Sequence, residues 1–70
     1  MDEAEKGKLK TLLNYWVEHN RQHAQEFREW AEQAKSFGQA EVHDDMMRAV
    51  QQMNRTNEFL LSALERLKEE

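Results

Sequence analysis

The chain has 70 residues, of which ten are Lys or Arg and fourteen are Asp or Glu, and its formal net charge is −4. This length accommodates a single domain, residues 1–70, whose small core needs support from self-association or a ligand. The acidic balance, with both signs interleaved, argues against binding to nucleic acid or an anionic membrane, because both require a concentrated basic surface. There is no cysteine, signal-peptide pattern or bilayer-length apolar run, so we expect a cytoplasmic protein.

The first half of the chain predicts one long helix over residues of about 3–37. Asp2, followed by Glu5, is suited to cap its N-terminus. Apolar residues recur at the three- and four-residue spacing of a helix face. They are Leu9, Leu12, Leu13, Trp16, Val17, Ala24, Phe27, Trp30, Ala31, Ala34 and Phe37.

Gly38 predicts a turn near the centre of the chain, because glycine adopts the left-handed conformation that ends many helices. A second helix is expected over residues of about 40–68, with Glu41 suited to its positive N-terminal end. Its core positions recur every seven residues at Met46, Met53, Leu60 and Leu67. The sequence therefore predicts an all-α fold, an antiparallel helical hairpin of two long helices.

The apolar stripes are too wide for a single contact between two helices. We therefore expect a homo-oligomer, a dimer in which two hairpins pack face to face as a four-helix bundle. A monomer with a third short helix from the N-terminal segment is the competing arrangement.

Polar residues interrupt both apolar stripes near mid-length. In the heptad row Leu9, Trp16, His23, Trp30, Phe37, a histidine lies between two tryptophans. His19 and Asn20 lie within a turn of His23, and the second helix carries Asn54, Thr56 and Asn57. Counted outward from Gly38, these residues lie at matching heights, so we expect one buried polar layer, termed the polar belt.

One interpretation of the polar belt is structural. A polar layer in an apolar bundle penalises slipped or mismatched arrangements, as buried Asn does in coiled coils. The chain would then be a register-setting interaction or oligomerisation module, with a second protein as a further partner. This is the interpretation that we favour from the sequence.

The alternative is a metal-binding homodimer. His19 and His23 are four residues apart and Glu26 follows three later, so their side chains share one helix face. Imidazole and carboxylate suit a divalent transition metal such as Zn, Fe, Ni or Cu. Asn57 or Glu58 of the second helix would complete the site or orient a ring.

Other functional signals are weaker. His43, followed by Asp44 and Asp45, resembles a surface metal cluster, but the aspartates equally serve the start of the helix. No phosphate-binding loop or nucleophile motif is present, and Ser36 and Ser62 have no nearby histidine in the sequence. A thin bundle also offers little concave volume for a substrate, so we expect no enzyme activity.

The stretch from Leu13 to Ala31 resembles a family of small prokaryotic helical domains of unknown function. Their pattern is W-x-x-H-N-x-x-H-A-x-x-[FY]-x-x-W-A, followed by a Gly turn and an N-E-x-L-like segment, which here is Asn57-Glu58-Phe59-Leu60. The resemblance implies a stand-alone two-helix module in which His19, Asn20, His23 and Asn57 are the positions of interest. It brings no established activity.

A weaker similarity links the chain to ferritin-like half-bundles, whose helical pairs dimerise around a metal centre. The Glu-x-x-His pairs of that pattern are missing. Glu26 follows His23 instead of preceding it, and Ala40 lies three residues before His43. A di-iron site of that type is therefore not expected.

Overall fold

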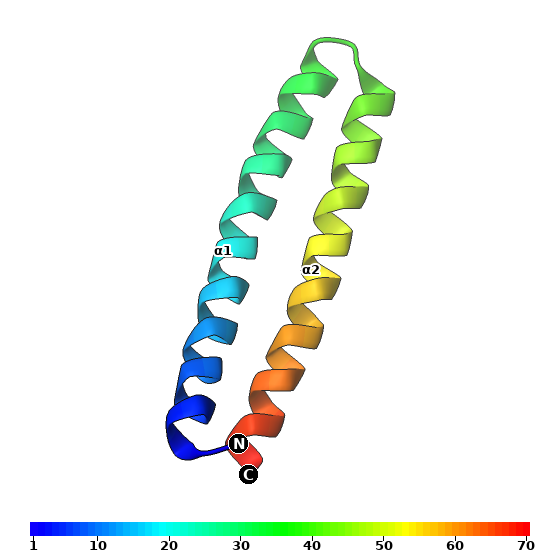
Figure 1. Cartoon of the computed structure of the whole chain (residues 1–70). Coiled ribbons are helices and arrows are strands. Elements are labelled where there is room, and N and C mark those ends of the chain that lie inside the picture. The colour runs from blue at the N-terminus through cyan, green and yellow to red at the C-terminus, as the bar shows by residue number, and fades with distance from the viewer.

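The computed structural model describes all 70 residues as two antiparallel helices joined by a short turn (Figure 1). Helix α1 spans Glu3–Ser36 and helix α2 spans Ala40–Glu69. The hairpin is long and thin, with extents of 53 × 14 × 12 Å, and the two termini lie together at the end opposite the turn. The predicted all-α hairpin is confirmed, and α1 is continuous from Glu3, so the N-terminal segment forms no separate third helix.

Local signals explain where the helices begin and end. The Asp2 carboxylate accepts a hydrogen bond from the Glu5 backbone N–H at 2.8 Å and thereby caps α1. At the turn, Gly38 has φ of +81°, the left-handed conformation that its missing side chain permits. The Gln39 N–H bonds to the Ala34 carbonyl at 2.9 Å and the Gly38 N–H to Lys35 at 3.0 Å, which is the Schellman pattern of a helix C-terminus.

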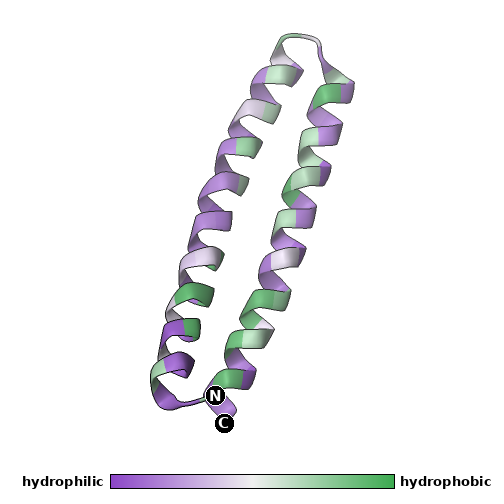
Figure 2. Ribbon diagram, viewed as in Figure 1, coloured by the Kyte–Doolittle hydropathy of each residue, from purple (hydrophilic) through white to green (hydrophobic).

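The contact between the two helices, termed the seam, is lined mainly by small and medium side chains. Ala24 and Ala31 of α1 are buried, as is Val50 of α2. Larger apolar side chains are fully buried only near the termini, where Leu13, Leu64 and Leu67 form a cluster, and those of Met46 and Met53 farther along α2 are half-buried. Figure 2 shows hydrophobic residues of both helices gathered at that end. The chain thus forms a core, but a narrow one.

Neither helix combines the length and the apolar composition that a bilayer-crossing segment requires.

Candidate functional site

An asparagine pair bridges the two helices near mid-length. Asn57 is only 6% exposed; its Oδ1 accepts a hydrogen bond from Asn20 Nδ2 at 3.0 Å. Its own Nδ2 donates to the Val17 carbonyl oxygen at 3.1 Å. No buried side-chain nitrogen or oxygen lacks a partner. The predicted match in height between Asn20 and Asn57 is therefore confirmed, and the buried amides satisfy each other.

The histidines do not join this layer, contrary to the single buried polar belt that the sequence suggested. His19 is exposed and the side chain of His23 is 40% exposed, both outside the seam. Consecutive residues are separated by 100° around the helix axis. Because Asn20 of α1 points into the seam, the preceding His19 points out of it. Asn54 and Thr56, also predicted to be in the belt, are likewise exposed beside the buried Asn57. The polar belt thus divides into an inner amide pair and an outer histidine pair.

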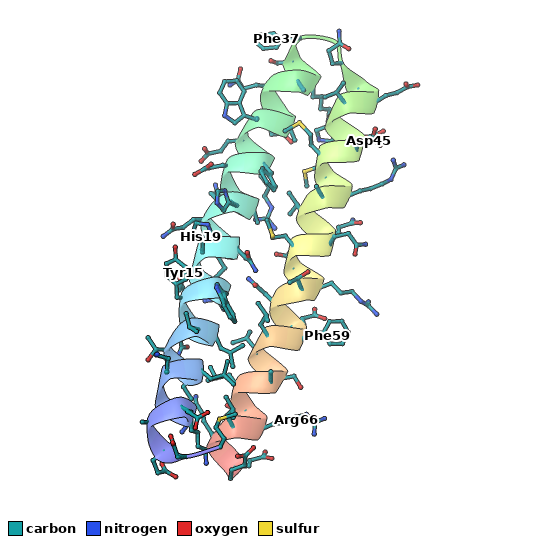
Figure 3. All side chains as sticks on the ribbon, viewed as in Figure 1. Tyr15, His19, Phe37, Asp45, Phe59 and Arg66 are labelled. Carbon is teal, nitrogen blue, oxygen red and sulfur yellow. The ribbon has the colours of Figure 1, made fainter.

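The outer pair belongs to a row of four rings along α1. Tyr15 stacks on His19 with ring centroids 5.4 Å apart, and His19 meets His23 edge-on at 4.4 Å. Phe27 lies beside His23, with centroids 6.1 Å apart. Figure 3 shows Tyr15 and His19 one above the other along α1, outside the seam. Because each ring contacts the next, the row restricts the rotation of both imidazoles.

Within this row, the Nε2 atoms of His19 and His23 are 3.0 Å apart. When both rings are neutral, one Nε2–H donates to the other ring's unprotonated Nε2. The Glu26 carboxylate lies 3.8 Å from Nδ1 of His23, on the side of the ring opposite to His19. Glu26 is therefore placed to orient His23, not to share its Nε2 side.

The structure does not gather the predicted metal ligands into one group. Only His19 and His23 converge, and no set of three His, Cys, Asp or Glu side chains in the chain is arranged to hold a metal ion. Both ends of the Asn57 amide are occupied within the seam, and Glu58 is exposed. A single chain therefore offers two imidazole nitrogens.

His43 forms a separate contact near the turn. Its Nε2 lies 3.5 Å from the Glu32 carboxylate of α1, and its Nδ1 lies 3.0 Å from Asp44. Asp45 is directed elsewhere and pairs with Arg48. The sequence indicated the aspartates but missed Glu32. The signal that could have found Glu32 is its distance from the turn. Glu32 lies six residues before Gly38 and His43 lies five residues after it, so the two residues are at similar heights on the two helices.

The large side chains lie mostly outside the seam. None of the six aromatic residues is buried, although aromatic side chains usually dominate cores. Trp30 is 64% exposed and Phe59 is 66% exposed. The hairpin therefore keeps its smallest apolar side chains inside and leaves its largest ones accessible.

Some of these accessible residues share one side of the hairpin, termed the open face, whereas Tyr15 and Phe59 lie two residues from the seam, on the outer side of their helices. We define it by residues that immediately precede a seam residue between Leu13 and Leu64, leaving out the two ends of the hairpin, where the charged Glu5 and Arg66 take this position. They are Leu12, Trp16, His19, His23 and Trp30 of α1, and Val42, Ala49, Thr56 and Ala63 of α2. Each lies 100° around its helix from the seam, in the same rotational sense. Because the helices run antiparallel, the same sense of rotation brings both sets to one side. The open face is apolar apart from Thr56 and the histidine pair, and it carries no charged side chain.

Comparison with known protein families gives one match. The model of a family described as "Domain of unknown function (DUF8180)" matches residues 9–67, which include all three histidines, both asparagines of the seam and the turn. Curated proteins and solved structures gave no match.

Proposed function

The chain belongs to this family of domains of unknown function (DUF8180), and we propose that it is a homo-oligomerisation module. In this proposal the Asn20–Asn57 pair sets the register of the hairpin, and the open face packs against a second copy to complete a four-helix bundle. The observation that carries the proposal is the exposure of the large apolar side chains.

The accessible surface supports a second copy as the occupant. A globular monomer of 8.4 kDa exposes about 4,600 Å², whereas this chain exposes 5422 Å². The excess of about 800 Å² equals what each partner buries in an interface of standard size. Stacking two hairpins would remove it, because each helix then gains a second apolar neighbour.

The composition of the open face also suits self-association. On α2 a stripe without charges repeats at heptad spacing, at Val42, Met46, Ala49, Met53, Thr56, Leu60, Ala63 and Leu67. A regular heptad stripe beside an already occupied seam is typical of helices in bundles, which contact two neighbours. Two copies with a net charge of −4 each repel weakly, but the repelling carboxylates lie outside the open face.

The amide pair supports the register-setting part of the proposal. Shifting one helix by a single turn against the other would separate Asn20 from Asn57 and bury an unpaired amide opposite apolar side chains, at a cost of about 1–3 kcal/mol. Apolar contacts between alanine and valine side chains discriminate less between such positions. The asparagines therefore favour one alignment of the helices.

The proposal assigns the chain a role in assembly and not in catalysis. Its surface has three depressions open to solvent, and the first, of about 410 Å³, is lined by Glu29, Trp30, Gln33 and Phe37. None of the three depressions contains a histidine, so no imidazole stands in a concave site where it could transfer a proton to a substrate.

The test is the solution mass of the chain and of two matched variants, measured by light scattering over a range of concentrations. Ala49→Glu places a carboxylate in the open face, and Gln51→Glu places the same group at an exposed site outside it. We expect twice 8.4 kDa for the wild type and for Gln51→Glu. Ala49→Glu should weaken the dimer about 100-fold or more, because a buried unpaired carboxylate costs at least about 3 kcal/mol.

Circular dichroism should show equal helix content in all three proteins before the masses are compared. A wild-type mass of one chain at every concentration would overturn the proposal. A dimer that tolerates Ala49→Glu as well as Gln51→Glu would also overturn it, because the open face would then not be the interface.

A further inference from the structure

We propose that two copies of the chain share one divalent transition-metal ion, held by His19 and His23 of each copy at the centre of the open face. This inference rests on the proposed dimer and adds a ligand to it. The chemistry that would recognise the site is that of Zn²⁺ and similar ions, which accept neutral imidazole nitrogens.

The spacing of the two imidazoles suits one ion. Two nitrogens bound at 2.0–2.1 Å are about 2.8–3.0 Å apart on neighbouring positions of an octahedral ion and about 3.3–3.4 Å apart on a tetrahedral one. The Nε2 atoms of His19 and His23 are 3.0 Å apart and face each other. An ion between them would replace their hydrogen bond with little movement of either ring.

The surroundings of the pair hold the rings in this orientation. Glu26 lies 3.8 Å from Nδ1 of His23, the nitrogen that faces away from His19. A carboxylate that accepts the Nδ1–H of a metal-binding histidine leaves Nε2 free for the ion. Glu26 lies on the side of the ring that this role requires, beyond hydrogen-bond distance in the metal-free chain. Tyr15 stacks on His19 and Phe27 lies beside His23, which limits ring rotation on both sides.

A single chain leaves the site incomplete. Structural zinc sites have four protein ligands, and no third His, Cys, Asp or Glu joins the two histidines to form a metal-binding group. Two identical pairs would supply four imidazoles. The second copy therefore contributes half of the site.

The histidine pair lies near the middle of α1, where a symmetric dimer can bring the pairs of both copies together. His19 is the seventeenth of the 34 residues of α1, so the pair lies at mid-length. Consider a dimer whose twofold axis lies in the plane of the open face and is perpendicular to the helices. In this dimer α1 packs antiparallel against α1 of the second copy. Only mid-length residues then meet their own counterparts.

The same axis also pairs the remaining residues of α1 consistently. With the axis midway between His19 and His23, each of these histidines faces the other one in the second copy. Leu12 then faces Trp30 of the copy, and Tyr15 faces Phe27 of the copy, because these residue numbers are symmetric about the same centre. Trp16 faces Glu26 of the copy, and the imidazoles meet imidazoles. The alternative axis, parallel to the helices, would place the histidines against Thr56 of α2 and its apolar neighbours, and the two histidine pairs would not meet.

The experiment is a titration of the full, metal-free chain with Zn²⁺, with stoichiometry from calorimetry and mass from light scattering on the same samples. We expect one ion per two chains, with the mass of a dimer. Cobalt(II) replaces zinc in a parallel titration, and visible absorption of tetrahedral cobalt is the expected spectrum.

Three variants locate the site. The double variant His19→Gln/His23→Gln should lose the stoichiometric ion and keep the dimer mass. His43→Gln removes the remaining histidine of the chain and serves as the matched control, which should bind zinc as the wild type does. Glu26→Gln should weaken zinc binding about tenfold or more, because it removes the carboxylate that orients His23.

The outcomes separate this inference from the proposed function. A dimer that binds no zinc, or that binds one ion per chain, would overturn the shared site and leave the oligomerisation module intact. A monomer, with or without a bound ion, would overturn both. Zinc binding that persists in the double variant and disappears in His43→Gln would overturn the site as placed here.

Discussion

Asn57 of α2 accepts a hydrogen bond from Asn20 of α1 at 3.0 Å and donates one to a backbone carbonyl of α1 at 3.1 Å. These are the polar side-chain contacts that tie the middle of one helix to the other. The nearest fully buried side chains are those of Val17, Ala24 and Val50, which fit many alignments. The energetic role of this pair can be measured directly.

Replacing Asn57 by Ala should lower the free energy of unfolding by about 1–3 kcal/mol, because the half-buried amide of Asn20 loses its partner and a small cavity opens in the seam. Urea unfolding followed by circular dichroism measures this loss. If the variant were as stable as the wild type, water would be satisfying Asn20, and the pair would contribute nothing to stability.

The double variant Asn20→Leu/Asn57→Leu separates register from stability. Removing both partners leaves no amide unsatisfied, so its free energy of unfolding should lie within about 1 kcal/mol of the wild type or above it. We expect it to show more than one set of backbone amide signals in NMR spectra, one for each helix alignment. A single set of signals would mean that the other seam residues already specify the alignment.

The two glycines should respond to alanine in opposite directions. Gly38 has φ of +81°, so Gly38→Ala forces a side chain into the left-handed region and should cost about 1–2 kcal/mol. Gly7 lies inside α1 with open space around its missing Cβ, so Gly7→Ala should stabilise the protein by about 0.5–1 kcal/mol. Thermal unfolding of both variants beside the wild type provides the comparison. Equal shifts of the same sign would contradict this assignment of the turn.

Asp2 should make the N-terminal turn of α1 sensitive to acid. The hydrogen bond from the Glu5 backbone N–H holds the pKa of the Asp2 carboxyl below its ordinary value of 3.8. A carboxyl whose folded-state pKa is depressed stabilises the fold above its ordinary pKa, and this contribution disappears as the pH falls through the lowered value. The amide proton of Glu5, followed by NMR, should therefore titrate with a midpoint below 3.8.

Asp2→Asn is the matched control for this titration, since it keeps an acceptor oxygen and removes the ionisation. The Glu5 amide signal should then change less across the same pH range, because the contribution of the Asp2 carboxylate is removed. A midpoint at or above the ordinary value in the wild type would show that the cap does not form in solution.

Much of the hairpin could be predicted from short segments of the sequence. The Asp2 cap and the glycine at the turn act over a few residues, and each appears in the structure where the sequence indicated it. The heptad spacing indicated the two helices correctly. It was wrong about the core of α2, where Met46, Met53 and Leu60 are only half-buried and the neighbouring row Val50, Asn57 and Leu64 is buried. The match in height between Asn20 and Asn57 followed from counting along two regular helices. These features depend on local geometry, which the chain carries in its residue order.

The sequence by itself therefore determined two helices, the turn between them and the level at which their polar residues meet. The tertiary structure decided which of two adjacent residues enters the seam: Asn20 and not His19, Ala24 and not His23, Asn57 and not Thr56. Either choice satisfies the helical period, because adjacent residues differ only by a rotation of 100°. The close approach of the helices resolves it, since a narrow seam accommodates alanine, valine and a self-satisfied amide pair, while the bulky rings are left on the outer surface.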